Sequence, residues 1–254
     1  MLAAVKSGNA KMLAELIGQD PGFNVNMDHD GDGRTLLHFA CWESHRSTMI
    51  PLLLAQPDID VNMKNSDGRT PFFYASSSGF PSCVREMLKD SRVKVNEPNN
   101  DGFTPLWYAA RNGHDDVIKL WIASGREIDL GTPGDVFKTD AIGEARWEDN
   151  TEIASLLERF KENPEETRHA TRVELGFLDD LAAEMFALVV FVSDSLLQIK
   201  DTTTPSPAAR FFSIASRLPL ELQMVLSCRV MGSNKDIVPG KDSEVAFKEL
   251  AKRL

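Results

Sequence analysis

The 254-residue chain has only three cysteines, and none of them forms a C-x-x-C pair. Cys41, Cys83 and Cys228 lie far apart in the sequence, and their number is odd. A disulfide framework or a zinc site is signalled by paired or clustered cysteines, so the sequence predicts neither. Reduced thiols are typical of reducing compartments, which favours a cytoplasmic protein, with a nuclear protein as the alternative.

Basic residues are outnumbered: Lys and Arg total 28, Asp and Glu total 38, and the formal net charge is −10. Nucleic-acid-binding domains and proteins of anionic membrane surfaces are usually basic, so we expect neither partner. Long hydrophobic runs are missing as well. The most apolar stretch, Met185 to Val192, lies between Glu184 and Asp194 and is too short to span a bilayer.

A repeated motif is the main positive feature of the sequence. Three stretches align, DGRTLLHFA from Asp32, DGRTPFFYA from Asp67 and DGFTPLWYA from Asp101, with starts 35 and 34 residues apart (67 − 32 and 101 − 67). A Val-Asn pair, such as Val61-Asn62, recurs with the same rhythm. A fixed period of this length is the signature of a repeat architecture.

Each repeat can be interpreted physically as turn, short helix, turn and second helix. The Asp-Gly pair suits a tight turn because glycine tolerates positive φ. Threonine is a good helix N-cap and proline suits the first helical position, so helices are predicted to start at Thr70-Pro71 and Thr104-Pro105. Apolar residues at helical spacing, such as Val117, Leu120 and Trp121, predict the second helix.

This pattern resembles the ankyrin repeat, whose signature D-x-x-G-x-T-P-L-H-x-A-A-x-x-G-H is matched closely by Asn99 to His114. There are departures: the His position is kept at His38 but is Phe73 and Trp107 in the next two units. The unit from about Asp30 also has a longer turn, around Ser44 to Thr48. The resemblance implies an all-α ankyrin-repeat solenoid of about four to five repeats, with divergent end repeats.

The resemblance also implies that a partner protein is bound by the turn tips and first helices, across a concave surface. We expect a monomeric protein–protein interaction scaffold without a cofactor or metal. The positions expected to contact the partner are Asp32, Arg34, Trp42, Glu43, Ser66, Arg69, Phe73, Ser77, Ser78, Asn100, Phe103, Trp107, Arg111 and Asn112. Arginine and aromatic residues are common hot spots, which ranks Arg34, Arg69, Phe103 and Trp42 first.

The array is expected to extend over residues 1–160. Leu2 to Ile17 looks like a unit without its opening turn, and Lys138 to Phe160 like a divergent final repeat in which Thr139 keeps the threonine of the motif. Terminal repeats are atypical because one of their faces meets water or another domain. The polar stretch Lys161 to His169 marks a predicted boundary, so that residues 161–254 form a helical capping segment.

Within the capping segment, Arg217 to Leu226 (RLPLELQMVL) allows two interpretations. It has the Pro-Glu-Leu pattern with which many F-box domains open, which would make the chain a substrate adaptor for a ubiquitin ligase. It also fits an ordinary helix that packs in a bundle against the last repeat, which we favour. The bundle interpretation predicts that Leu222 and Leu226 are buried. Further helices are expected over Arg210 to Arg217 and Ser243 to Leu254.

Signals for chemistry are weak. Met27 to Gly33 (MDHDGDG) fits the first half of an EF-hand loop, but position twelve, which needs a bidentate Glu, is Phe39. We therefore interpret this stretch as an acidic turn tip. No catalytic motif stands out, and we expect no enzymatic activity. The alternative is an enzyme whose site lies at the junction of the array and the C-terminal segment.

Overall fold

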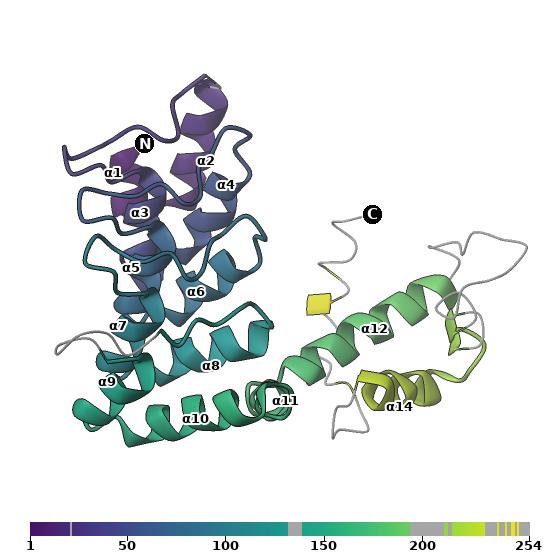
Figure 1. Ribbon diagram of the computed structural model, residues 1–254. Helices are drawn as coiled ribbons and strands as arrows, with labels where there is room; N and C mark the ends of the chain where they lie inside the picture. Colours follow the sequence, from purple (N-terminus) through teal and green to yellow (C-terminus); the bar gives the residue numbers. More distant parts are fainter. Residues whose placement is uncertain are drawn as a thin grey trace, which may run out of the picture. The chain divides into compact units, whose positions relative to one another are not determined.

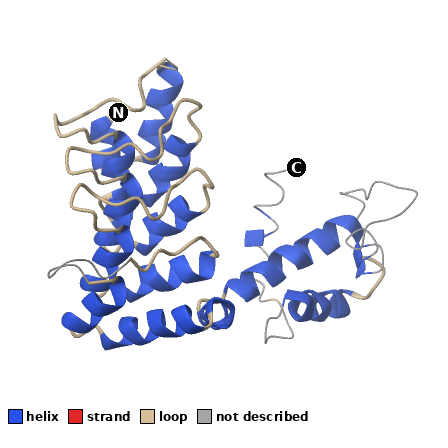
Figure 2. Cartoon of the chain, in the orientation of Figure 1, coloured by secondary structure: helices blue, strands red, loops and turns tan. Residues whose placement is uncertain are grey.

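The computed structural model describes residues 1–20, 22–131, 139–193, 211–212, 215–231, 238, 242, 245–246 and 248. Regular secondary structure in these ranges is entirely helical (Figure 2). The chain divides into two compact units, Met1–Thr171 (unit 1) and Arg172–Leu254 (unit 2), each described by itself.

The described part of unit 1 is a stack of helix pairs. The first helices of successive pairs contact one another, and so do most of the second helices (Figure 1). The pairs are α1 (Leu2–Lys6) with α2 (Ala10–Gln19), α3 (Leu36–Cys41) with α4 (Ile50–Leu54), α5 (Pro71–Ser77) with α6 (Pro81–Leu88), α7 (Pro105–Arg111) with α8 (Asp115–Ser124), and α9 (Ala141–Trp147) with α10 (Thr151–Glu162). This arrangement confirms the predicted all-α repeat solenoid.

The predicted helix starts are confirmed at α5 and α7. The hydroxyl of Thr70 accepts a hydrogen bond from the Phe73 N–H, and that of Thr104 accepts one from the Trp107 N–H, both at 3.2 Å. In the last pair the cap is Asp140, whose carboxylate accepts from the Gly143 N–H at 2.7 Å. The alignment that placed Thr139 at the motif's threonine is therefore one residue early.

A left-handed residue follows the first helix in four of the five pairs, at Gly8, Gly79, Gly113 and Asp149, where the chain reverses. A Cβ on Gly79, which has φ of 71°, would lie 2.4 Å from the His114 ring. The corresponding residue of the final repeat is Asp149, which adopts φ of 58° without being glycine. The final repeat therefore keeps this turn, although its sequence lacks the glycine.

The expected longer turn of the second repeat is a short 3-10 helix, η1 (Ser44–Met49), before α4. Arg46 holds it in place: its guanidinium donates to the Phe39 carbonyl at 3.2 Å and to the Glu43 carboxylate at 2.7 Å. Arg46 is only 8% exposed, and the Glu43 carboxylate pairs with its charge inside the repeat.

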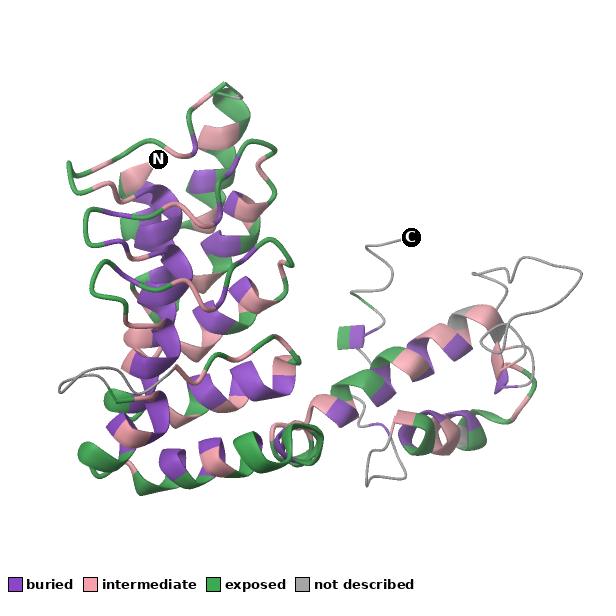
Figure 3. Ribbon diagram, in the orientation of Figure 1, coloured by how far each residue is buried: buried purple, intermediate pink, exposed green. Residues whose placement is uncertain are grey.

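The core of unit 1 lies between the two columns of helices (Figure 3). Trp121 of α8 and Phe72 of α5 are fully buried and meet edge to face, with ring centroids 5.0 Å apart. Helices α3 and α5 are buried along almost their whole length. Such enclosure of large apolar side chains is the main stabilising contribution of a repeat stack.

Unit 1 continues beyond the predicted boundary at residue 160. Helix α11 (Pro164–Glu174) begins inside it, with Thr167 and Thr171 buried. The Arg168 guanidinium lies 5.3 Å from the Phe160 ring centroid, which ties α11 to α10. The polar stretch Lys161 to His169 is thus mainly helical, and the division between the units follows Thr171.

In unit 2, α12 (Phe177–Ser193) packs against α14 (Leu220–Met231) around Ala183, Phe186 and Cys228. The prediction for Leu222 is wrong: its side chain is 51% exposed, and Leu226 is only half-buried. The buried stripe of α14 instead carries polar and small residues, because its inward positions are Gln223, Ser227 and Cys228.

Two predicted helices are described only in part. Of Arg210 to Arg217, residues Phe211, Phe212 and Ala215 are helical, and most of Ser243 to Leu254 lies outside the described residues. Among the helices that are described, none has the length and apolarity needed to cross a membrane.

Candidate protein-interaction face

The turn tips and first helices of unit 1 form one continuous surface, which we call the first-helix face. One position of it lies seven residues after the N-cap of the first helix, and its side chain varies among four of the repeats. These side chains are Trp42, Ser77, Arg111 and Trp147, after the caps Thr35, Thr70, Thr104 and Asp140. Sequence reasoning missed Trp147, although it is 81% exposed, because the alignment of the last repeat was one residue early.

Aromatic rings follow one another along this face from repeat to repeat. Trp42 meets Tyr74 at a centroid distance of 5.3 Å, Phe73 meets Tyr108 at 5.2 Å, and Phe103 meets Trp107 at 4.2 Å. Phe103 and Tyr108 are half-buried, so parts of this row remain open to a partner. Partly exposed aromatic groups on rigid helices are typical anchors of protein interfaces.

Arginines lie over these rings. The guanidinium carbon of Arg34 is 4.9 Å from the Trp42 ring, and that of Arg111 is 5.4 Å from the Trp107 ring. Arg69 lies 5.4 Å from Phe73 in its own repeat. Cation–π contacts of this kind fix a guanidinium in place while its edge stays available for hydrogen bonds.

The three arginines differ in their ion pairs. Arg34 reaches the carboxylates of Asp30 at 3.0 Å and Asp32 at 2.7 Å, both on its own turn. Arg111 lies 3.6 Å from a carboxylate oxygen of Glu144 and 3.5 Å from one of Glu148. Arg69 has no carboxylate within 4.0 Å among the described residues, so it carries the one of these three charges that the chain leaves unpaired.

Trp107 and Phe73 were expected to contact a partner but are buried by contacts between repeats. The Trp107 indole N–H donates to the Thr139 carbonyl at 3.1 Å, as His38 Nε2 does to the Arg69 carbonyl at the same distance. Trp107 is 6% exposed and therefore replaces the histidine of the motif as a structural donor. Phe73 is fully buried, so its expected place on the contact surface is wrong: it is enclosed between Arg69 and Tyr108.

The burial of His38 fixes its protonation state. Desolvation lowers the pKa of His38 from 6.5 to about 4, so the ring is neutral near pH 7. Nδ1 accepts a hydrogen bond from the Thr35 N–H at 3.1 Å, which leaves Nε2 as the donor to the next repeat. Protonation would make Nδ1 a donor as well, and it would then face the Thr35 N–H, which is also a donor.

Asn100 and Asn112 use their amide groups within the stack. Asn100 donates to the Ser66 carbonyl and Asn112 to the Ser77 carbonyl, both at 2.8 Å. The other predicted residues stay at least partly accessible: Asp32 and Ser66 are exposed, and Glu43, Ser77 and Ser78 are half-buried. The two asparagines therefore contribute first to the register of the repeats.

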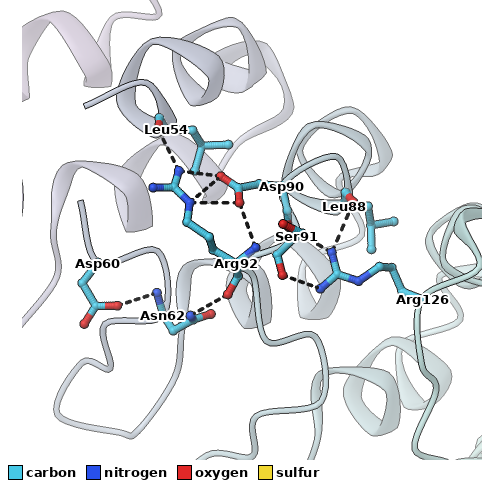
Figure 4. A network of polar contacts seen from close by, with 8 residues as sticks. All are labelled: Leu54, Asp60, Asn62, Leu88, Asp90, Ser91, Arg92 and Arg126. Atoms are coloured by element: carbon cyan, nitrogen blue, oxygen red, sulfur yellow. Dashed lines mark hydrogen bonds and ion pairs between the residues drawn. The ribbon is translucent and has the colours of Figure 1, made fainter. Parts of the chain in front are cut away.

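The opposite side of unit 1 is closed by polar contacts that the sequence analysis did not assign. We call the second helices and the loops after them the second-helix side. Figure 4 shows Arg92 donating to the Leu54 carbonyl at 2.8 Å, and Arg126 donating to the carbonyls of Leu88 at 3.4 Å and Ser91 at 3.5 Å. Each arginine thus satisfies the end of the second helix of the preceding repeat.

The asparagine of the repeated Val-Asn pair has a similar role. Asn62 donates to the Arg92 carbonyl at 2.9 Å and accepts from the Lys94 N–H at 2.7 Å. Asn26 and Asn96 bridge to their next repeats in the same way. The fixed spacing of these asparagines is the sequence signal that could have predicted this series of hydrogen bonds between repeats.

The acidic stretch at Met27 to Gly33 is a turn held by its own side chains. The Asp28 carboxylate accepts from the N–H groups of Asp30 and Gly31, both at 3.0 Å, and the first of these lowers the pKa of Asp28. Within the described residues, no cluster of His, Cys, Asp or Glu could hold a metal ion.

These features define a helical repeat protein whose first-helix face is open and whose second-helix side is closed upon itself. Comparison with known proteins identifies the class: residues 46–132 match the family described as ankyrin repeats, in three copies. The chain therefore contains ankyrin repeats. Ankyrin repeats are protein-interaction modules, so the chain contains such a module.

Two curated relatives are similar to a short part of the chain. They are the SMC5-SMC6 complex localization factor protein 1 of Bos taurus and that of Homo sapiens, each 42% identical over 57 residues. The aligned part covers 22% of this chain and only 5% of each relative. The similarity therefore extends over a small fraction of proteins that are far longer.

Proposed function

We propose that the protein is a non-enzymatic scaffold that binds a partner protein through its first-helix face. The observation that carries this proposal is the open row of aromatic and arginine side chains, with Trp42 and Trp147 exposed at equivalent positions of two repeats. A large apolar ring exposed to water is unfavourable, and these two tryptophans are not needed to form their helices. A binding role therefore explains their exposure best.

Further support comes from the relatives, whose name describes a factor that localizes a complex. A scaffold that brings a partner to its place of action is consistent with that description. The described cysteines are all free and buried, which supports action in a reducing compartment of the cell.

The test is quantitative affinity purification with the full chain as bait. The bait variant Trp42→Ala combined with Trp147→Ala removes the two exposed anchors. The matched control is Lys89→Ala combined with Lys94→Ala, two well-exposed positions on the second-helix side. We expect specific partners to fall at least tenfold with the first variant and to stay unchanged with the control. Equal recovery with both variants would contradict the proposal.

A second candidate function has one specific observation in its favour. In α14, Leu222 and Val230 are 51% and 50% exposed, and with Leu226 they share one helical stripe. This exposure revives the hypothesis that the segment docks on a ubiquitin-ligase subunit, as an F-box-like module would. Loss of ligase subunits from the purification on Leu222→Ser with Val230→Ser, with the other partners retained, supports the adaptor. If no ligase subunit is recovered with the wild-type chain, the adaptor is rejected.

A further inference from the structure

One rule relates neighbouring repeats on the first-helix face. The side chain seven residues after a helix N-cap packs against the side chain four residues after the next N-cap. The contacts that follow this rule are Trp42 with Tyr74 at 5.3 Å and Arg111 with Glu144 at 3.6 Å.

At one of these positions the first residue of the pair is too small to make the contact. The residue that precedes Tyr108 in this arrangement is Ser77, whose hydroxyl turns back to the Tyr74 carbonyl at 3.4 Å. A serine cannot cover a tyrosine ring as Trp42 does in the repeat before. Tyr108 therefore lacks the neighbouring ring that Trp42 provides for Tyr74 in the repeat before.

The hydroxyl of Tyr108 is also available. Tyr74, its counterpart one repeat earlier, accepts a hydrogen bond from the Asn65 amide at 3.1 Å. The described residues give Tyr108 no such partner, and its side chain is half-buried, so the hydroxyl can donate to an incoming group.

Arg69 lies beside the same ring. Its guanidinium carbon lies 5.5 Å from the Tyr108 ring, and its Nε is enclosed without a hydrogen-bond partner, whereas its terminal nitrogens remain accessible. Its backbone is fixed on both sides, because the Arg69 N–H donates to Asn65 at 2.8 Å and the Arg69 carbonyl accepts from His38. The cation is thus positioned in advance and unpaired.

We propose that Arg69, Ser77 and Tyr108 form a cradle for an acidic residue of a partner peptide, with a large apolar side chain next to it. The carboxylate accepts from the Arg69 guanidinium and from the Tyr108 hydroxyl. The apolar side chain packs against the Tyr108 ring, which Ser77 does not cover. This inference rests on the proposed use of the first-helix face for binding a protein.

An acidic ligand suits the cradle even though the whole chain is acidic. Net charge governs long-range steering, which salt screens, whereas a partly buried guanidinium on aromatic rings acts at contact distance. Charge-assisted hydrogen bonds to such a group are about twice as strong as neutral ones. Arg34 and Arg111 do not offer the same site, because carboxylates of this chain already reach them.

The test uses a display library of random 14-residue peptides selected against the full chain. We expect the enriched peptides to share an Asp or Glu beside an aromatic or long aliphatic residue. For one such peptide, Arg69→Gln should weaken binding at least tenfold and Arg69→Lys less, because lysine keeps the charge but not the planar fork. Replacement of the peptide's Glu by Gln should cost little further affinity in the Arg69→Gln chain.

Ser77→Trp provides an independent variant. Tryptophan is native at this position in two other repeats, so the variant is expected to fold, and its side chain would fill the cradle and abolish binding. The matched control is Lys89→Gln, which removes an exposed cation on the second-helix side and should change affinity less than threefold. Urea denaturation verifies that each variant remains folded.

The outcomes separate the two proposals. Enriched peptides that need Trp42 and Trp147 but lack a shared acidic residue, or that ignore Arg69→Gln and Ser77→Trp, overturn the cradle and leave the first-helix face as the binding surface. Peptides with a shared basic residue overturn the cradle as well. Peptides whose binding is insensitive to every first-helix-face variant contradict both proposals.

Discussion

The first-helix face and the second-helix side of unit 1 use arginine in different ways. On the second-helix side, Arg92 and Arg126 donate to backbone carbonyls of the preceding repeat, so their hydrogen bonds are made within the stack. On the first-helix face, Arg34 and Arg69 lie on aromatic rings, and the terminal nitrogens of Arg69 are unpaired. The comparison shows that an arginine is structural where acceptors of the same chain bind its guanidinium. An arginine can bind a partner where such acceptors are missing.

Arg126→Met should have the largest effect on stability. It removes donors to the carbonyls of Leu88, Asp90, Ser91 and Val93, of which the Asp90 carbonyl keeps the Val93 N–H. The expected loss in the free energy of unfolding is about 2–3 kcal/mol, measured by urea denaturation. The matched variant Arg69→Gln should lose no more than about 0.5 kcal/mol. Similar losses in both variants would remove the distinction between the two sides.

Acidification should weaken the bridge at His38. An unfolded histidine binds a proton below pH 6.5, whereas burial lowers the pKa of His38 to about 4. The unfolded state therefore binds more protons between these values, and stability falls as the pH is lowered from 6.5 towards 4. We expect a loss of roughly 2 kcal/mol between pH 7 and pH 5 from this residue.

The control for the pH experiment is His38→Gln, which lacks the titrating ring. Its free energy of unfolding should change much less between pH 7 and pH 5. His29, whose pKa is also lowered by burial, contributes a residual dependence of the same sign. If the variant and the wild type show the same pH dependence, His38 is not the group that responds.

Trp107→Phe should have the smallest effect and tests the one inter-repeat bond made by a first-helix-face indole. Phenylalanine is native at the equivalent position 73, so the ring is tolerated, but the donor to the Thr139 carbonyl is lost. The expected cost is about 1 kcal/mol in thermal or urea unfolding. Trp107→His should restore part of it, as in the His38 repeat; an unchanged stability in Trp107→Phe would show that the bond contributes nothing.

Much of the fold could be predicted because repeats are local. The 34- to 35-residue period, Thr70-Pro71 and Thr104-Pro105 give the helix starts directly, since capping depends on residues a few positions apart. The last repeat was aligned one residue early because Asp140 and Asp149 replace the usual threonine and glycine. The same offset concealed Trp147, which only the structure places in line with Trp42 and Arg111.

In unit 2 the prediction was weaker, because helix periodicity indicates a buried stripe but not which stripe is buried. Leu222 was expected inside, and the structure instead exposes Leu222 and buries its neighbour Gln223. Small inward residues such as Ala182, Ala183 and Ala187 let α12 and α14 pack on positions that hydrophobicity alone would not choose.

The sequence by itself determined the ankyrin-repeat class, the helix starts of the central repeats and the general location of a binding face, since these depend on short-range pattern and period. Only the tertiary structure decided which residues of that face are available. Phe73, Trp107, Asn100 and Asn112 are used by neighbouring repeats, whereas Arg69 and Tyr108 keep open donors. The physical reason is that a hydrogen bond or ion pair between repeats joins residues about 30–40 positions apart, and a motif alone does not show whether that partner is present.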